Sequence, residues 1–206
     1  MATLPDAKQS PSQAVDLKRS INDSRRFLRG YELSLDERSK RVRKNHFSNG
    51  NNGEERKRMA AEALAEARRR NRPVELGGSG CPILVEGKRD KAALLSLLFE
   101  GELELVNRGW PLEKLAGWFA QHLQHKNPID AKESIILLMD WDRTGGRLQN
   151  DLRRRLRAFD ISIDEYTRQI LMRALKPETR VVEDLHSMAE ELLPLLEELD
   201  PSEESE

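Results

Sequence analysis

Two aspartates follow the most apolar segment of the chain. Residues 134–139 predict a buried strand, and Asp140 and Asp142 come directly after it. If the extended conformation continues, both carboxylates point to the same side. At about 4 Å and an effective dielectric of about 20 they repel by roughly 4 kcal/mol, which a divalent cation offsets. Mg²⁺ fits this role, with Mn²⁺ as the alternative ion, because Mg²⁺ takes one or two carboxylates together with water and substrate phosphates.

A third acid, Glu86, ends a different predicted strand at residues 82–85. Ligands of open α/β sheets sit at the carboxyl ends of the strands, so Glu86 is expected in the same crevice, as a metal ligand or a proton shuttle. The structural alternative is that strand-end acids only cap the next helix, and for an isolated Asp-x-Asp this alternative is favoured. The joint pattern of Glu-Gly at one strand end and Asp-x-Asp-x-x-Gly at another favours the metal site.

The segments that must position these acids alternate between strand and helix patterns. Strands are expected at residues 82–85, 103–106, 134–139 and 161–163, with a further edge strand at 181–182. Helices are expected at 90–99, 111–123, 148–159, 164–175 and 184–199, the last with a kink near Pro194. This order predicts an α/β fold with a mostly parallel, Rossmann-like sheet and flanking helices.

Composition and charge divide the 206 residues into three predicted parts. Residues 1–79 are expected to be a basic extension, partly disordered, with a short helix at 16–29 and a weakly docked or free helix at 54–70. Residues 80–186 form the α/β domain, and 187–206 an acidic C-terminal helix and tail. Residues 1–75 hold 18 Lys and Arg against 11 Asp and Glu, whereas 76–206 hold 17 against 25. The basic arm can neutralise phosphates, and the acidic tail can repel nucleic acid or fold back on the arm.

Several classes of protein are excluded by what the sequence lacks. The longest apolar run has five residues, whereas a membrane-spanning helix needs about 20. No signal-peptide pattern is present, so a cytoplasmic location is expected. The single Cys81, expected to be a buried thiol, excludes an internal disulfide framework. His122 and His125 are interpreted as surface residues, and Trp141 as packing against a helix more readily than stacking on a base.

Residues 85–90, Val-Glu-Gly-Lys-Arg-Asp, and 138–146, Leu-Met-Asp-Trp-Asp-Arg-Thr-Gly-Gly, resemble the two signature motifs of the Toprim domain. That domain is shared by topoisomerases, bacterial-type primases, some nucleases and the 5S rRNA maturation ribonucleases. The chain looks most similar to small archaeal Toprim proteins related to those ribonucleases. Segments 163–164 and 182–185 resemble later parts of the pattern, so the resemblance covers about residues 82–186.

The resemblance implies roles for individual residues. In Toprim enzymes the glutamate is held to be a general acid/base and the two aspartates bind Mg²⁺. These roles fall on Glu86, Asp140 and Asp142, with Glu86 also a potential ligand. Residues beside the acids are expected to bind phosphates, with Lys88 also assisting catalysis, or else to form a solvated charged face with glycine turns. They are Gly87, Lys88, Arg143, Gly145, Gly146 and Arg147.

The expected function is therefore a Mg²⁺-dependent, nuclease-like phosphodiester enzyme that acts on RNA or DNA. One alternative is a non-catalytic module that binds nucleic acid or assembles an RNA-processing or replication complex. Another is primase-like nucleotidyl transfer. Neither Tyr31 nor Tyr166 sits in a recognisable DNA-cleavage domain, and no primase zinc domain is evident. The resemblance thus supports the fold and the metal site more than one reaction.

Overall fold

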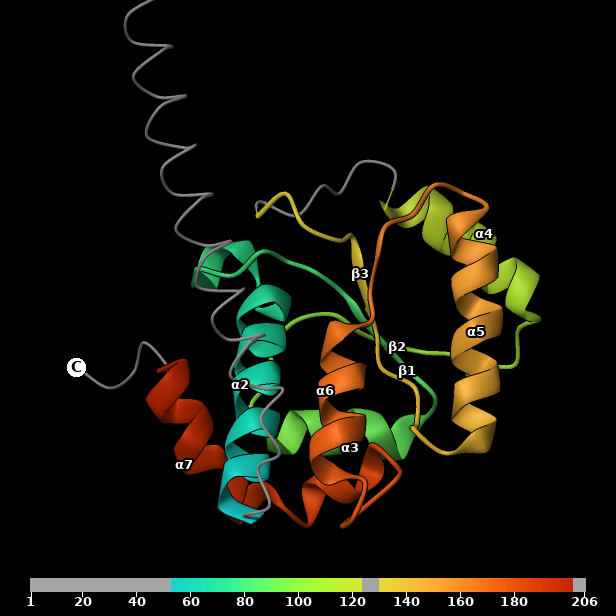
Figure 1. The fold of residues 1–206 in the computed structure, drawn as a ribbon. Helices are drawn as coiled ribbons and strands as arrows, with labels where there is room; N and C mark the ends of the chain where they lie inside the picture. The colour runs from blue at the N-terminus through green and yellow to red at the C-terminus, as the bar shows by residue number, and fades with distance from the viewer. Residues whose placement is uncertain (1–52, 124–129, 202–206) are drawn as a thin grey trace, which may run out of the picture. The chain divides into compact units, whose positions relative to one another are not determined.

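The structure is a computed structural model that describes residues 53–123 and 130–201, and residues 51–206 form one compact unit. Helices and strands alternate along this unit as the sequence predicts (Figure 1). The helices are α2 (Gly53–Asn71), η1 (Val74–Leu76), α3 (Lys88–Ser96), α4 (Leu112–Leu123), α5 (Arg143–Arg157), α6 (Tyr166–Leu175), η2 (Glu183–His186) and α7 (Ala189–Leu199). The strands are β1 (Ile83–Val85), β2 (Leu103–Leu105), β3 (Ile135–Leu137) and β4 (Ile163–Asp164). The expected helix at 16–29 and His125 lie outside the described residues.

The four strands form one parallel sheet in the order β2-β1-β3-β4. Ile83 of the central strand β1 pairs with Leu103 on one side and with Ile136 on the other. After β1 the chain crosses to β2 on one side, and β3 begins the other half of the sheet. The junction of β1 and β3 is therefore a topological switch point, where α/β sheets bind ligands. The predicted α/β fold with a parallel sheet is confirmed.

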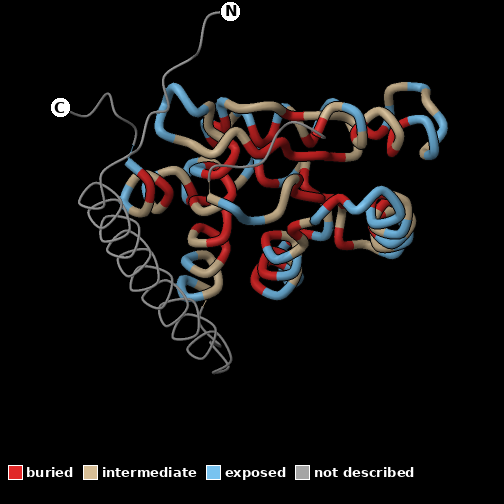
Figure 2. The backbone as a smooth tube through the Cα atoms, turned by 90° about the horizontal axis from the view of Figure 1, so that it is seen from above, coloured by how far each residue is buried: buried red, intermediate tan, exposed pale blue. Residues whose placement is uncertain are grey.

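Strand residues alternate between two cores, because successive side chains of a strand point to opposite faces. Ile83, Val85 and Ile136 face the core beneath α2, α3, α6 and α7. Leu84 and Leu137 face the core beneath α4 and α5. Both faces of the sheet are covered, and Figure 2 shows buried residues through the middle of the described backbone. This arrangement explains why these strands are continuous apolar runs in the sequence.

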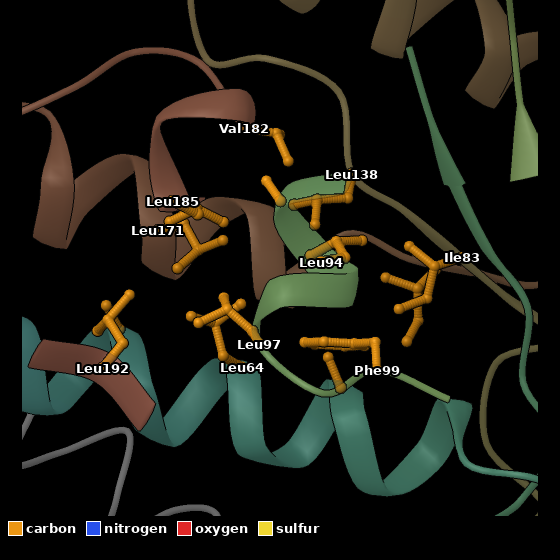
Figure 3. Packing of buried hydrophobic residues seen from close by; sticks show 14 of the residues in the cluster. Leu64, Ile83, Leu94, Leu97, Phe99, Leu138, Leu171, Val182, Leu185 and Leu192 are labelled. Atoms are coloured by element: carbon orange, nitrogen blue, oxygen red, sulfur yellow. The ribbon is translucent and has the colours of Figure 1, made fainter. Parts of the chain in front are cut away.

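Helix α2 is an integral part of the core, so the prediction of a weakly docked or free helix is wrong. Leu64 is fully buried and packs in one cluster with Leu97, Leu171 and Leu192 from three other helical segments (Figure 3). The helix buries mainly alanines, which let neighbouring helices approach closely although they contribute little to an apolar pattern. The expected domain boundary at residue 79 falls inside this unit, because the turn at 72–80 packs tightly. A Cβ on Gly78 would lie 1.9 Å from the Arg72 carbonyl oxygen.

The acidic C-terminal segment folds back on the basic residues of α2. Arg68 is 2% exposed, and its Nε donates to Oδ2 of the 5%-exposed Asp200 over 2.9 Å. Arg72 donates to the same carboxylate over 2.8 Å, and Arg58 pairs with Glu198. Of the two alternatives for the acidic tail, folding back is therefore the one observed in the described residues.

The C-terminal part of the described chain differs from the sequence prediction in two respects. The expected edge strand at 181–182 is absent from the described sheet, because Val182 leads into η2 and its amide bonds to a side chain. Helix α7 contains Pro194 and begins at residue 189, later than expected. None of the described helices is long and apolar enough to cross a membrane.

Candidate active site at the junction of strands β1 and β3

Glu86 lies directly after β1 and reaches across to the end of β3. Its Oε1 accepts a hydrogen bond from the Asp140 amide over 3.1 Å. Its backbone carbonyl accepts one from the Asn107 amide over 2.9 Å, in the loop after β2. Burial raises the pKa of Glu86, and the nearby charges of Asp90 and Asp142 raise it further. The structure therefore brings Glu86 beside Asp140, as the sequence predicts.

Asp140 has the most perturbed carboxyl group of this region. Its Oδ1 accepts a hydrogen bond from the Val182 amide over 2.7 Å. Its pKa is raised from 3.8 to about 7, mainly by burial. The hydrogen bond from Val182 lowers the pKa, whereas the negative charges of Glu86, Asp90 and Asp142 raise it further. A carboxyl group with a pKa near neutrality, in a cluster of other acids, is typical of functional sites.

Asp142 is the N-cap of α5, where its Oδ1 accepts a hydrogen bond from the Gly145 amide over 2.7 Å. This bond satisfies one of the free amides of the first helical turn. Trp141, between the two aspartates, is 6% exposed, and its Nε1 donates to the Thr179 carbonyl over 2.7 Å. The expectation that Trp141 packs inside the protein is confirmed, so its ring is not an open surface for a base.

Gly145 and Gly146 differ in what they contribute at the start of α5. A Cβ on Gly145 would lie 2.2 Å from the backbone oxygen of Asp140. Only glycine therefore lets the helix approach the end of β3 this closely. A Cβ on Gly146 would meet only the Arg168 guanidinium at 3.8 Å, an ordinary contact. Gly145 thus sets the position of Asp140 relative to the helix.

The other residues expected to bind phosphates lie around these acids. Gly87 is the N-cap of α3, and its amide donates to Oδ2 of Asp90 over 2.8 Å, so Asp90 caps the first turn of this helix. Lys88, Arg143 and Arg147 are exposed. None of these three cations joins an ion pair with another described residue, so all three are available to a bound anion.

Two further residues contribute to this region, and sequence reasoning assigned neither of them a role there. Arg168 of α6 donates from Nε to the Met139 carbonyl over 2.9 Å and from Nη2 to the Asp140 carbonyl over 2.6 Å. Its positive charge also opposes the raised pKa of Glu86. Val182 contributes only its amide to Asp140. These residues follow Asp140 by 28 and 42 positions. Arg168 forms part of no local motif, whereas Val182 begins the segment 182–185, whose resemblance to the Toprim pattern assigned it no role.

The side-chain oxygens of this region suit a hard divalent cation, because those of Glu86, Asp140 and Asp142 are carboxylate oxygens. Within residues 53–123 and 130–201, however, no group of three or more His, Cys, Asp or Glu side chains is arranged to hold a metal ion. The hydrogen bonds explain this, since Glu86, Asp140 and Asp142 each direct one oxygen to a backbone amide. Two aspartates that also bind water and a substrate phosphate would satisfy Mg²⁺ without a third protein ligand.

Comparisons with known proteins identify relatives over about half of the chain. A UPF0292 protein of Thermococcus sibiricus is 33% identical over 106 residues, which cover 52% of this chain and 75% of the relative. A UPF0292 protein of Thermococcus onnurineus is 30% identical over the same length and is covered to 71%. No protein-family model matches the chain. A solved Aquifex aeolicus protein aligns with a TM-score of 0.44 and 25% identity, over 61% of this chain and 94% of that protein.

Proposed function

This chain belongs to the UPF0292 family, and we propose that it is a Mg²⁺-dependent phosphodiester enzyme acting on nucleic acid. The observation that carries the proposal is the hydrogen bond between Glu86 and the Asp140 amide. It joins the acids of two strand ends at the topological switch point of the sheet. The resemblance of both motifs to the Toprim pattern supports the same assignment.

Asp140 and Asp142 are the residues proposed to hold Mg²⁺, with Glu86 as a further ligand or as the proton carrier. When bound, Mg²⁺ supplies Lewis-acid stabilisation of the charge that builds on the phosphate. The raised pKa of Asp140 supports this role, since the metal-free cluster disfavours its charged form. Mn²⁺ is expected to substitute, because it prefers the same oxygen ligands.

Glu86 is proposed to move the proton. A general acid or base works best when its pKa lies near the working pH, and burial raises the pKa of Glu86 in that direction. The Asp140 amide orients the carboxylate through Oε1. In the described residues no hydrogen bond engages Oε2, which is therefore the oxygen proposed to face the nucleophile or the leaving group.

Exposed cations on both sides of the acids are proposed to bind the phosphates that flank the reacting one. Lys88 begins α3, and Arg143 and Arg147 lie on the first turns of α5. These cations pair with no described acid, so they contribute little to the stability of the fold. They are therefore proposed to bind a polyanion. Their distribution on two helix starts favours an extended substrate such as nucleic acid.

A non-catalytic nucleic-acid-binding module is the second candidate. It is favoured by the backbone bonds of Glu86, Asp140 and Asp142, since each acid also has a structural partner. In this case the cations and the arm bind nucleic acid, and the acids only shape the strand ends. Binding that survives Glu86→Gln, with no turnover of any nucleic acid, would distinguish it from the enzyme.

The test is cleavage of structured RNA and of DNA by the full chain with Mg²⁺, Mn²⁺ or EDTA. We expect metal-dependent cleavage that falls by about 10²-fold or more in Glu86→Gln, as for removal of a general acid or base. Asp140→Asn should lose activity at least as completely. Asp160→Asn is the matched control, because Asp160 is exposed with a φ of 56°, a conformation that asparagine also adopts readily. Equal cleavage by Asp140→Asn and Asp160→Asn would refute the enzymatic role.

A further inference from the structure

The three tryptophans of the chain occupy two kinds of environment. Trp141 is buried and hydrogen-bonded, whereas Trp110 and Trp118 are only half-buried. Trp110 lies in the loop after β2, and Trp118 is on α4, with its ring centroid 6.4 Å from that of Trp110. Both side chains pack against the core beneath α4 and α5 and keep part of their surface exposed.

Basic groups cover the faces of these two rings. The Arg108 guanidinium lies 5.3 Å from the Trp110 centroid and 5.2 Å from the Trp118 centroid. The Lys114 ammonium lies 4.5 Å from the Trp110 centroid. On Trp118 the His122 ring stacks at 4.5 Å with an interplanar angle of 15°. We call Arg108, Trp110, Lys114 and Trp118 the aromatic surface.

The two cations of the aromatic surface are held differently. Arg108 donates from Nε to the Leu105 carbonyl over 2.7 Å and pairs with Glu104, so it is fixed to strand β2. Lys114 is exposed and forms no ion pair with another described residue. The face of Trp110 beneath Lys114 is therefore covered by a side chain that a ligand can displace without breaking an ion pair.

The backbone connects the aromatic surface directly to the candidate active site. The Asn107 amide donates to the carbonyl of Glu86 over 2.9 Å. Trp110 follows three residues later, and three residues of extended chain span at most about 11 Å. A polymer whose phosphate lies beside Glu86 can therefore extend onto the aromatic surface.

We propose that the aromatic surface binds unpaired bases of single-stranded nucleic acid beside the phosphate that the site engages. The inference rests on the proposed function and specifies its substrate as a strand with unstacked bases. A base replaces Lys114 over Trp110, and the displaced ammonium moves to a phosphate of the same strand. Base–aromatic stacking is stronger than an exposed cation–π contact, so the exchange favours the bound state.

The test measures binding of a labelled single-stranded ten-nucleotide oligomer to the full chain by fluorescence anisotropy in EDTA. An abasic oligomer of the same length and a duplex serve as comparison ligands. We expect the normal oligomer to bind at least about tenfold more tightly than the abasic one, because every base has a face that can stack. Trp110→Leu should remove about that tenfold difference, and Trp110→Phe should restore most of it. The comparison of Trp110→Leu with Trp110→Phe decides the outcome by itself, so the test does not depend on whether Trp118→Leu folds.

Phe159→Leu is the matched control, since Phe159 is an aromatic residue that is 51% exposed at the end of α5. It should bind as the wild type does. Intrinsic fluorescence gives a second readout: the oligomer should quench Trp110 and Trp118 but leave the emission of buried Trp141. Equal binding of normal and abasic oligomers, which a protein-docking surface would produce, overturns the proposal. So does wild-type binding by Trp110→Leu.

Failure of this inference can be told apart from failure of the proposed enzyme. Oligomer binding in EDTA requires neither metal nor turnover, so it reports on the aromatic surface independently of the enzyme. Stacking that depends on Trp110, without cleavage under any metal condition, supports the aromatic surface and refutes the enzyme. Metal-dependent cleavage with no loss of binding in Trp110→Leu refutes the aromatic surface and supports the enzyme.

Discussion

Two clusters of charged residues in this molecule have opposite organisation. At the C-terminal end of α2, Arg68 and Arg70 are almost fully buried, and each meets carboxylates from distant segments. At the ends of β1 and β3, by contrast, Glu86, Asp90 and Asp142 add their negative charges to that of Asp140. The partly buried cation among them, Arg168, donates its hydrogen bonds to backbone carbonyls. The first cluster balances its charges and the second does not. Matched pairs therefore hold this fold together at α2, whereas the excess of acids at the strand ends raises the pKa of Glu86 and Asp140.

The ion pairs of the α2 cluster make a simple prediction for stability. Arg68→Met should destabilise the domain by about 3–5 kcal/mol, because it removes one of the two close guanidinium partners of buried Asp200 and also the side-chain donor to the Leu196 carbonyl. Chemical denaturation of the full chain measures this loss. Arg154→Met is the control, since Arg154 is exposed and its one ion pair within the described residues is with Asp151 on the same helix. Comparable stability of the two variants would show that the buried ion pairs of α2 do not stabilise the fold more than an exposed pair does.

Gly145 gives the sharpest test of geometry in the acidic cluster. Gly145→Ala should lower cleavage by about 10²-fold, because the new Cβ would force the Asp140 backbone and α5 apart. Gly146→Ala, one residue along the same helix, meets no close atom and should retain activity. Cleavage rates at saturating Mg²⁺ make the comparison. Similar rates for both alanine variants would show that the close approach is not needed for function.

The acidic cluster should destabilise the metal-free protein above neutral pH. The folded-state pKa of Asp140 is about 7 against 3.8 unfolded, so the folded state binds the proton more tightly. The resulting stabilisation is present at low pH and is lost as pH rises from about 4 to 7. In EDTA at pH 8, Asp140→Asn should therefore be more stable than the wild type by about 2 kcal/mol, after allowance for solvent screening.

That difference should shrink towards zero at pH 4, which thermal melting at several pH values can follow. Addition of Mg²⁺ at pH 8 should raise the melting temperature of the wild type but not of Asp140→Asn, since an ion bound only by the folded state stabilises it. A variant less stable than the wild type at pH 8 would mean that the Val182 hydrogen bond outweighs burial and repulsion.

The smallest effects are expected from the exposed cations. Lys88→Met and Arg143→Met should change the free energy of unfolding by less than about 0.5 kcal/mol. Each should reduce the salt dependence of nucleic-acid binding by about one unit of slope, because one phosphate contact is lost. Arg154→Met, on the same helix as Arg143, provides the comparison. An unchanged slope in both cation variants would assign these residues to a solvated face.

Local patterns predicted the sheet and the acids well. The apolar run before Asp140 and the shorter run before Glu86 are both buried strands, and helix periodicity located α4 and α5. The carboxyl ends of parallel strands lie at the same edge of a sheet, and this rule was enough to predict that Glu86 lies beside Asp140. The alanines of α2 were misjudged because their burial depends on α6 and α7, which lie more than 90 residues further along. Arg168 was missed for the same reason, since its partners are backbone carbonyls that no side-chain pattern can reveal.

The pairing of Arg68 with Asp200 has a consequence for how the protein is made. On the ribosome α2 emerges before any strand of the sheet, yet the acids that neutralise its buried arginine are 129 and 132 residues later. Until those residues are synthesised, the apolar face of α2 and an unpaired guanidinium stay exposed to the cell. Stable packing of α2 therefore requires residues as late as 200, so this part of the core can be completed only near the end of synthesis.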